Sequence, residues 1–332
     1  MKYNYVLLGA SSDLYEFSYS DLKKIDYAYY IPGMDYNLGK IGNFLFRLHT
    51  WNRLNKIIEL PFKRTWNRFL LGRFPFKGDK KLCFILMGSW IEYDNQLHLL
   101  DYLRNKYKGC KIVWFLQDLI ATRRMHDGSS LFMDDLKNKL DMIFSFDQKD
   151  CKKYGLIYHH LVFSSYENEV DERPDSDVYF LGKAKNRHKD IIKVYEILKG
   201  RGLKCDFHIA GVPIEEQAYR DEIDYEPHIS YKENLQRILH TKCLLELMQK
   251  GGVGFTQRGC EAVCLNKKLL TNNPEIKNAP FYNSEYISCF SDVKDIDINF
   301  IEEIRKDMVV DYNYKYNFSP IKLLEFIDEK LN

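Results

Sequence analysis

The segment from Gly251 to Asn273 holds the side chains best suited to bind a charged ligand. It opens with glycines, and glycine lets a backbone turn tightly or approach a ligand closely. The pattern that follows predicts a short helix over about 257–265 and then a buried strand over 268–271. The amino end of such a helix exposes unpaired N–H groups and the positive end of the helix dipole. We therefore expect this turn to suit a phosphate group.

Two charged residues on the predicted helix extend this expectation. Arg258 carries a planar guanidinium that can bind a diphosphate with two hydrogen bonds. Glu261 lies one turn later on the same side of the helix and could accept hydrogen bonds from two ribose hydroxyls. We expect this carboxylate to lie in a surface cleft. The alternative is that the two residues form an ordinary, weak surface pair at spacing i, i+3.

Residues 229–273 also resemble the nucleotide-sugar half of GT-B glycosyltransferases from bacterial surface-polysaccharide pathways, which make capsule, lipopolysaccharide or exopolysaccharide. Those proteins tend to carry a G-x-T-x-R-x-x-E-A segment followed by a K-K-L-[IL]-T-x-N strand. The matching residues here are Gly254, Thr256, Arg258, Glu261 and Ala262, then Lys267, Lys268, Leu269, Leu270, Thr271 and Asn273. Many GT-B enzymes also have a glutamate eight positions before the second one, and that position is Val253 in this chain.

The resemblance implies an α/β fold with two Rossmann-like domains that face each other across a cleft. It implies a nucleotide-sugar as the donor substrate and no cofactor. The donor-binding residues that it implies are Gly254, Thr256, Gln257, Arg258, Glu261 and Asn273. In GT-B proteins a basic residue after the first strand of the second domain often meets the donor diphosphate. Lys183, in a predicted turn, holds this place, with Lys185 and Arg187 as alternates that could instead cap a helix or face solvent.

The length of 332 residues suggests two domains. Six predicted strands alternate with helices up to Phe163, and these elements include a helix over Asn95–Tyr107 and a last strand over Ile157–Phe163. A second alternation begins at Asp177 and includes a strand over Cys205–Ala210. Between them, residues 164–176 are polar and acidic, which is typical of a linker. We therefore predict an acceptor-binding domain over 1–165 and a nucleotide-sugar-binding domain over 177–332. In GT-B proteins the last helix, predicted here over 320–331, often crosses back onto the first domain.

Asp118 is the candidate catalytic residue of the first domain. It follows the predicted buried strand Lys111–Leu116, whose residues are apolar nearly throughout. Open α/β sheets bind ligands at the carboxyl ends of their strands. Asp118 could therefore act as the general base that activates an acceptor hydroxyl. The alternative is that it caps a helix or merely lies in a loop.

Residues 40–81 differ in composition from the rest of the chain. They contain eleven Lys or Arg against only Glu59 and Asp79, and eight Phe or Trp are interleaved with them. This composition is typical of a segment that binds an anionic membrane surface. The alternative is a solvated helical hairpin whose aromatic side chains pack on the sheet. A nucleic-acid site is disfavoured, because no known reader motif accompanies the basic residues.

Several classes of protein are excluded by what the sequence lacks. The net charge of +2 is near neutral, so the overall charge does not imply binding to nucleic acid. No apolar stretch approaches the ~20 residues that span a bilayer, so we expect no transmembrane helix. The eight cysteines include no C-x-x-C pair, so we expect a protein of the reducing cytosol without disulfides or a zinc site. Asp175 and Asp177 have the spacing of a D-x-D metal motif, but they lie in the predicted linker.

These observations favour a metal-independent glycosyltransferase that moves a sugar from a nucleotide-sugar to a hydroxyl of a saccharide acceptor. The expected acceptor is a lipid-linked oligosaccharide, reached from the cytoplasmic face of the membrane through residues 40–81. Two alternatives stay open. One is a nucleotide-sugar epimerase on the same scaffold, which needs no acceptor. The other is a non-catalytic GT-B partner subunit, which binds donor weakly or not at all.

Overall fold

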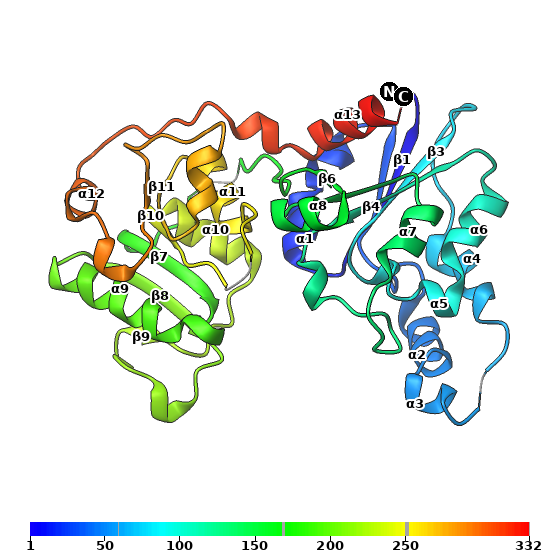
Figure 1. Ribbon diagram of the computed structural model, residues 1–332, viewed down its shortest axis with the longest axis horizontal. Coiled ribbons are helices and arrows are strands. Elements are labelled where there is room, and N and C mark those ends of the chain that lie inside the picture. The colour runs from blue at the N-terminus through cyan, green and yellow to red at the C-terminus, as the bar shows by residue number, and fades with distance from the viewer. Residues whose placement is uncertain (59, 168–169, 250–251, 332) are drawn as a thin grey trace. The chain divides into compact units, whose positions relative to one another are not determined.

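The computed structural model describes residues 1–58, 60–167, 170–249 and 252–331 (Figure 1). The chain divides into two compact units. Unit 1 contains Met1–Ser164 and Ser319–Asn332, and unit 2 contains Ser165–Phe318. Each unit is built on a six-stranded sheet in which every pair of neighbouring strands is parallel. The prediction of an α/β fold with two Rossmann-like sheets is therefore confirmed.

The sheet of unit 1 has the strand order β2-β1-β3-β4-β5-β6. Its strands are β1 (Asn4–Leu8), β2 (Ala28–Ile31), β3 (Leu82–Leu86), β4 (Lys111–Leu116), β5 (Met142–Ser145) and β6 (Ile157–Tyr158). Parallel strands covered on both faces bury both sets of alternating side chains. In β1, Val6 and Leu8 join one hydrophobic cluster, while Tyr5 and Leu7 join the cluster on the opposite face.

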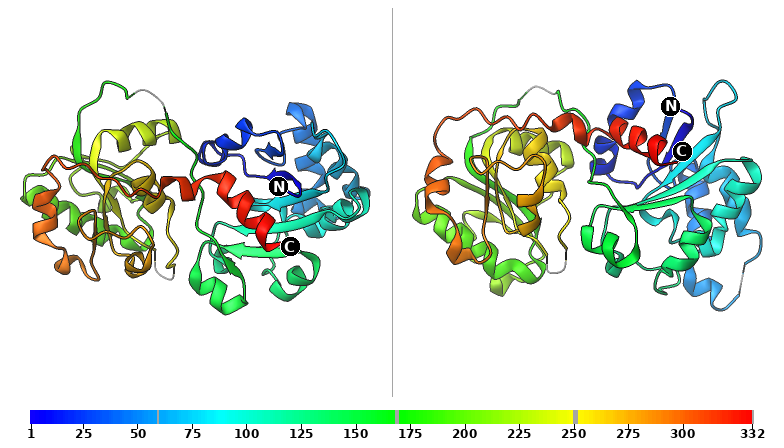
Figure 2. Two further views of the ribbon diagram at one scale, coloured as in Figure 1. Left: turned by 90° about the horizontal axis from the view of Figure 1, so that it is seen from above. Right: turned by 45° about the horizontal axis from the view of Figure 1, so that its top comes forward.

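Helices cover both faces of this sheet (Figure 2). The larger cluster includes side chains from α2 (Gly39–His49), α4 (Trp66–Leu71), α5 (Asp94–Leu97), α6 (Leu99–Lys106) and α7 (Met133–Lys139). On the other face lies α13 (Pro320–Lys330), whose Leu323, Leu324 and Ile327 are fully buried against the sheet. The remaining helices of unit 1 are α1 (Asp13–Ser18), α3 (Asn52–Asn55) and α8 (Gln148–Tyr154).

The sheet of unit 2 has the order β12-β11-β10-β7-β8-β9. Its strands are β7 (Ser176–Lys183), β8 (Cys205–Ala210), β9 (Ile223–Asp224), β10 (Thr241–Glu246), β11 (Lys268–Thr271) and β12 (Ile287–Cys289). An apolar cluster packs α9 (His188–Gly200) and α12 (Ile298–Glu303) on one face. Contacts to the other face come from α10 (Tyr231–Leu239), where Asn234 accepts a hydrogen bond from the Tyr179 hydroxyl at 3.0 Å. Helix α11 (Gln257–Cys264) follows β10.

Three predicted elements differ from the structure. The helix predicted over Asn95–Tyr107 is two helices, because His98 adopts a left-handed backbone with φ of 47° and ends α5. The strand predicted over Ile157–Phe163 pairs with β5 only through Ile157 and Tyr158. Lys183 is the last residue of β7 rather than part of a turn, because it continues the pairing with β8 as far as Ala210.

Candidate functional site

The order of strands in unit 2 reverses between β7 and β10. The chain adds β8 and β9 on one side of β7, and then β10, β11 and β12 on the other side. Open parallel sheets bind ligands outside the carboxyl ends of the strands at such a point. The residues at these two carboxyl ends are Lys183 of β7 and Glu246 of β10. The polar side chains around them form the candidate site of unit 2.

Arg187 joins these two strand ends. Its guanidinium donates to the Lys183 carbonyl from Nε at 3.3 Å and from Nη2 at 3.2 Å, and Nη1 donates to the Leu247 carbonyl. Burial lowers the pKa of Arg187, and the nearby charge of Arg258 lowers it further, while Glu246 raises it. Two guanidinium groups are thus held close enough to repel each other at the carboxyl edge of the sheet. A doubly charged anion would relieve that repulsion.

Arg258 lies on α11 and reaches the same edge. Its Nη2 donates to the Leu181 carbonyl at 3.1 Å, and its Nη1 forms an ion pair with Glu261 Oε2 at 2.6 Å. A guanidinium carries five N–H donors. Arg258 Nη1 also donates to Asn234 Oδ1 at 3.4 Å. Within the described residues, these contacts use only part of the donor set of either arginine. Both guanidinium groups can therefore still donate to an added oxygen.

Glu261 is buried, and this corrects both sequence-based interpretations of its surroundings. Its side chain is only 2% exposed, so it lies neither in an open cleft nor on the surface. Besides Arg258, its Oε1 accepts from the Tyr231 hydroxyl at 2.9 Å and from the Asn234 amide at 3.1 Å. Burial raises the pKa of Glu261, although Arg258 and these two donors counteract it. Arg258 and Glu261 do form an ion pair, but the Glu261 side chain of that pair is buried inside unit 2.

The remaining predicted donor residues surround the start of α11. Thr256 is the N-cap, and its hydroxyl accepts from the Arg258 N–H at 3.1 Å. Gln257 donates to the Tyr231 hydroxyl at 3.0 Å. Asn273 is fully buried: its amide nitrogen donates to the Gly254 carbonyl at 3.3 Å and its oxygen accepts from the Glu275 N–H at 3.1 Å. Asn273 therefore supports the turn from within. Gly251, where the predicted turn opens, lies outside the described residues.

Glu246 is a member of this group that sequence analysis missed, because it lies inside the apolar run of β10. It is 4% exposed and accepts hydrogen bonds from the hydroxyls of Thr256 and Thr271. Burial raises its pKa, and the two hydroxyls and both nearby arginines lower it. The polar residue at the end of an apolar strand was the signal that could have identified it.

Lys183 and Lys185 add positive charge at the rim of this edge. Lys183 is exposed at the end of β7. Lys185 has a left-handed backbone with φ of 45°, which is uncommon outside glycine, and its ammonium donates to Gln249 at 2.9 Å. Such backbone strain is often found at functional sites. The structure thus brings Lys183, Lys185, Arg187 and Arg258 to one edge of the sheet.

The sheet of unit 1 also reverses its order, between β1 and β3. Asp118 lies two residues beyond the end of β4, and its side chain is 58% exposed. Arg123 Nη1 pairs with Asp118 Oδ2 at 3.2 Å, and Arg123 Nε pairs with Glu92 Oε1 at 3.0 Å. Glu92 follows β3 along the chain and was not identified from the sequence. The carboxyl edge of this sheet therefore presents two carboxylates on one guanidinium.

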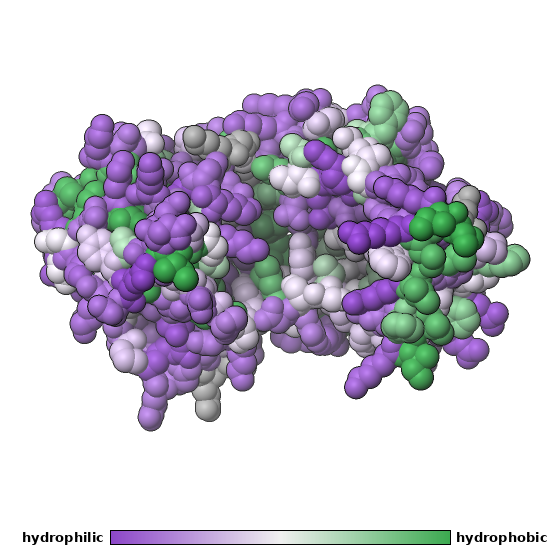
Figure 3. All heavy atoms as spheres, turned by 90° about the horizontal axis from the view of Figure 1, so that it is seen from below, coloured by the Kyte–Doolittle hydropathy of each residue, from purple (hydrophilic) through white to green (hydrophobic). Residues whose placement is uncertain are grey.

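Residues 40–81 divide into a packed and an exposed set. Phe46 is buried, and Trp66, Phe74 and Phe76 pack against the core of unit 1, as a hairpin packed on the sheet would require. Hydrophobic surface, drawn in green, gathers on one side of unit 1 in Figure 3. The apolar side chains on and after α2 and α3 that face solvent include Ile41, Phe44, Leu45, Leu48, Trp51, Ile57, Ile58 and Phe62. Arg47, Arg53, Lys56, Arg64 and Arg68 are exposed beside them. We call this set the basic apolar patch.

Two features are absent from the part of the chain that the structure describes: a cluster of metal ligands and a membrane-spanning helix. No group of three or more His, Cys, Asp or Glu side chains in this part of the chain is placed to hold a metal ion. Within the same residues, no helix has the length and apolar character that crossing a bilayer requires.

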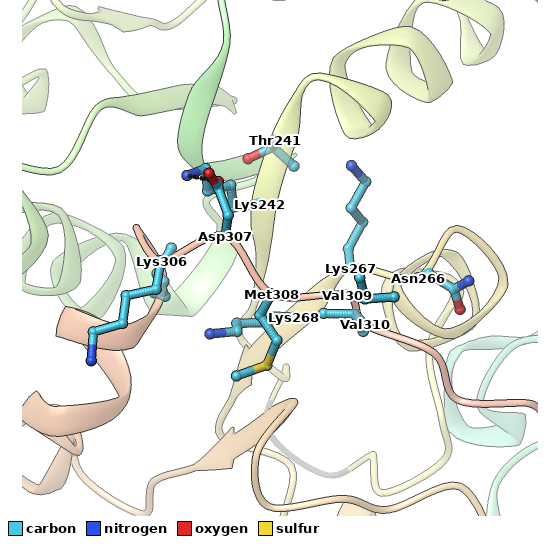
Figure 4. A pocket seen from close by; sticks show the side chains of 11 residues that line it. Thr241, Lys242, Asn266, Lys267, Lys268, Lys306, Asp307, Met308, Val309 and Val310 are labelled. Atoms are coloured by element: carbon cyan, nitrogen blue, oxygen red, sulfur yellow. Dashed lines mark hydrogen bonds and ion pairs between the residues drawn. The ribbon is translucent and has the colours of Figure 1, made fainter.

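A pocket of about 320 Å³ lies at the opposite edge of the unit 2 sheet (Figure 4). It is lined by Thr241 and Lys268, the first residues of β10 and β11, and by the segment 306–310. The ammonium groups of Lys267 and Lys268 bind the carbonyls of Leu239 at 2.7 Å and Glu303 at 2.6 Å. Both of these ammonium groups are thus paired with main-chain carbonyls.

Comparisons with known proteins give distant likenesses only. No protein-family model matches this sequence, and no curated protein matches it. An α-glucosyltransferase solved with UDP-glucose and DNA containing an abasic site is 12% identical, with a TM-score of 0.38 over 75% of this chain and 74% of its own. A GtfA/B complex is 12% identical, with a TM-score of 0.42 over 81% of this chain and 59% of its own. At this distance the likenesses do not bear on function.

Proposed function

We propose that this chain is a GT-B glycosyltransferase that transfers a sugar from a nucleotide-sugar to a hydroxyl of a saccharide acceptor. The observation that supports it most is the pair of guanidinium groups, from Arg187 and Arg258, fixed at the carboxyl ends of β7 and β10. In this reaction a nucleoside diphosphate leaves, and catalysis must stabilise the negative charge that grows on it. The two arginines, Lys183 and the start of α11 would supply that stabilisation, so the proposal requires no metal ion.

The buried carboxylates of Glu261 and Glu246 would position the groups that bind the diphosphate. Glu261 holds Arg258 through the 2.6 Å ion pair and also fixes Tyr231 and Asn234 of α10. Glu246 holds Thr256, the N-cap of α11, in place. A guanidinium whose position is fixed before the ligand arrives loses less entropy on binding. Both glutamates would thereby raise the affinity for a diphosphate without touching it.

In unit 1, Asp118 is the proposed general base for the acceptor hydroxyl. Its exposed position at the carboxyl end of β4 allows an acceptor to reach it. The proposed acceptor is a lipid-linked oligosaccharide of a bacterial surface-polysaccharide pathway. The support for a lipid is the basic apolar patch, in which exposed aromatic side chains lie beside exposed Lys and Arg. The protein would then work at the inner face of the cytoplasmic membrane, attached peripherally through this patch.

A thermal-shift screen of nucleotide-sugars and nucleoside diphosphates tests the donor site. A ligand at ~100 times its dissociation constant stabilises the folded state by about 2.7 kcal/mol. We expect at least one nucleoside diphosphate to stabilise the wild type, to stabilise Arg258→Gln much less, and to stabilise Arg201→Gln as well as the wild type. Arg201 is the matched control, because it lies on the surface and pairs with Glu302.

The screen, followed by analysis of the products formed with and without a saccharide acceptor, separates the alternatives. A nucleotide-sugar that binds and is converted to an isomer without acceptor would indicate an epimerase. Absence of any nucleotide binding would contradict the transferase and indicate a non-catalytic partner subunit. Release of nucleoside diphosphate that depends on an added saccharide acceptor is the result that the proposal expects.

A further inference from the structure

Arg123 is shared by two carboxylates at the carboxyl edge of the unit 1 sheet. Its Nε lies 3.0 Å from Glu92 Oε1, and its Nη1 lies 3.2 Å from Asp118 Oδ2. The three side chains differ in exposure: Arg123 is 17% exposed, Glu92 19% and Asp118 58%. An added ligand can therefore reach Asp118 more readily than Glu92.

The inner part of this group is fixed by the fold. Arg123 Nη2 donates to the carbonyl of Gly88, two residues beyond the end of β3. The Glu92 carbonyl accepts from the His126 N–H at 2.8 Å, and the His126 ring stacks on Tyr93 at 4.0 Å between ring centroids. The backbone of Glu92 and the guanidinium of Arg123 are thus each held by a main-chain hydrogen bond, whereas the side chain of Asp118 pairs with Arg123.

The charges that act on this group come from α1, α2 and the segments after β3 and β4. Burial raises the pKa of Glu92, Arg123 lowers it and Asp118 raises it. Burial and the charge of Asp118 raise the pKa of Tyr15, on α1, to about 12, against the effect of Arg123. Burial also raises the pKa of Tyr93, with Arg47 lowering it and Glu92 raising it. Arg123 is therefore the central positive charge, and two carboxylates compete for it.

We propose that Glu92 is a positioning residue for the transfer reaction, which shares Arg123 with Asp118 and thereby keeps the Asp118 carboxylate in position. This inference rests on the proposed function. In the reaction, the proton of the acceptor O–H moves to the Asp118 carboxylate, and the acceptor oxygen forms the bond to the anomeric carbon. The bond from that carbon to the diphosphate oxygen breaks, and its electron pair leaves with the nucleoside diphosphate.

Removal of the Glu92 charge has a defined consequence. In Glu92→Gln, Arg123 keeps its charge, and Asp118 becomes its sole carboxylate partner within the group of three. A carboxylate that interacts more strongly with a guanidinium releases its proton at lower pH, and it is a weaker base. The acid limb of the pH–rate profile should therefore move down by about one pH unit, with a lower rate on the plateau above it.

The experiment uses the whole protein and the nucleotide-sugar that gives the largest thermal shift. Slow hydrolysis of that nucleotide-sugar, with water in place of the acceptor hydroxyl, is measured against pH for wild type, Glu92→Gln, Glu92→Asp and Asp118→Asn. Glu92→Gln should move the acid limb, Glu92→Asp should restore it in part, and Asp118→Asn should abolish the limb. The matched control is Glu329→Gln, on the exposed surface of α13, which should behave as the wild type.

Two outcomes would overturn the inference. An acid limb that stays in place in Glu92→Gln would show that Glu92 has a structural role only. Complete loss of the limb in Glu92→Gln, with the limb kept in Asp118→Asn, would show that Glu92 is itself the base.

A second measurement separates failure of this inference from failure of the proposed function. The carboxyl carbon of Glu92 is titrated by NMR in wild type and in Asp118→Asn, with no substrate present. Because Asp118 raises the pKa of Glu92, that pKa should fall in Asp118→Asn. An unchanged pKa contradicts the shared charge at Arg123 directly, whether or not any nucleotide-sugar binds. If the pKa of Glu92 falls but no nucleotide-sugar is hydrolysed, the shared charge at Arg123 is supported and the proposed function is contradicted.

Discussion

Both sheets are parallel and reverse their strand order at the first strand, but they differ in how many strands lie on each side of it and carry opposite charges at their carboxyl edges. In each, the strand order reverses at the first strand of its sheet, β1 in unit 1 and β7 in unit 2. The edge of unit 2 gathers Lys183, Lys185, Arg187 and Arg258 around the buried Glu246. The edge of unit 1 instead presents Glu92 and Asp118 around the single Arg123. The edge of unit 2 is therefore suited to a polyanion, whereas the edge of unit 1 offers carboxylates that can accept a proton.

The outer surface of unit 1 has the opposite charge to its carboxyl edge. Unit 1 carries the basic apolar patch, whose side chains Ile41 and Ile57 are 79% and 80% exposed. A large exposed apolar patch on a soluble domain marks a place where something binds. The following predictions test the contrast between the units, from the largest expected effect to the smallest.

The largest effect should come from removing charge beside the patch. Wild type should sediment with vesicles that contain anionic lipid and not with neutral ones. Replacing Arg47, Arg53, Lys63, Arg64 and Arg68 by Gln removes five charges, each worth about 1 kcal/mol at an anionic surface, and should abolish sedimentation. Rising salt should weaken binding of the wild type without removing it, because salt does not screen the apolar contacts.

The control for charge alone is a set of five exposed lysines in unit 2, replaced in the same way: Lys189, Lys193, Lys232, Lys277 and Lys294. This variant should sediment as the wild type does. Wild type that stays in solution with anionic vesicles at low salt would leave the lipid-linked acceptor without support.

The second prediction concerns the internal ion pair of unit 2. Glu261→Gln removes one partner of a buried pair and leaves Arg258 without its carboxylate, so unit 2 should lose about 3 kcal/mol of unfolding free energy. All four tryptophans, Trp51, Trp66, Trp90 and Trp114, lie in unit 1. Far-UV circular dichroism in urea should therefore show the change, while tryptophan fluorescence should not.

Glu302→Gln serves as the control for this measurement, because Glu302 is 59% exposed. It should alter the unfolding free energy by no more than about 0.5 kcal/mol. A Glu261→Gln protein as stable as the wild type would mean that the carboxylate is dispensable to the fold.

The third prediction concerns the two guanidinium groups. Arg187→Gln and Arg258→Gln should each weaken binding of the best nucleoside diphosphate by about 1.5–3 kcal/mol, the usual worth of a hydrogen bond to a charged group. The loss for the matching nucleoside monophosphate should be smaller, since fewer phosphate oxygens are present. Calorimetric titration measures both. Equal losses for the two nucleotides would point to a damaged fold instead of a lost phosphate contact.

The smallest effect should be the pH dependence contributed by Glu246. Burial raises its pKa above the ordinary value of 4.5, so its ionisation opposes folding. The stability it contributes is complete below that ordinary value and is lost as pH rises through the higher value in the folded state. Glu246→Gln should therefore reduce the loss of unit 2 stability between about pH 4.5 and neutral pH. Urea unfolding at several pH values measures this slope, and an unchanged slope would contradict it.

The strands that bury apolar side chains on both faces of a sheet were predictable from sequence, because a short, almost continuous apolar run is typical of a buried parallel strand. Strands β4, β8 and β11 begin and end where the sequence predicts, and α11 ends one residue early. The two-residue strands β6 and β9 carry too little pattern, since they pair only at the edge of a sheet. The break at His98 depends on a left-handed backbone that an apolar helical pattern does not reveal.

The chemistry at the sheet edges was predictable only in part. Arg258, Thr256 and Asp118 stood at positions that the order of elements marks, at a helix start or a strand end. The contacts of Glu261 could not be predicted from the sequence. Tyr231 and Asn234 lie about 30 residues earlier in the chain, and only folding brings them close to Glu261. Glu92 belongs to a segment without regular periodicity, and its role depends on an arginine that lies 31 residues later.

The return of the chain to unit 1 has a consequence for biosynthesis. Helix α13 covers the face of the first sheet that includes Tyr5, Leu7, Cys83 and Phe115, and Asp328 accepts hydrogen bonds from the Tyr5 hydroxyl and the Lys2 N–H. A ribosome makes those strands long before it makes residues 320–330. Unit 2 lies between them in sequence and can fold first, while the earlier sheet keeps one apolar face bare. During that interval the nascent chain is a natural client for a chaperone that binds exposed hydrophobic surface.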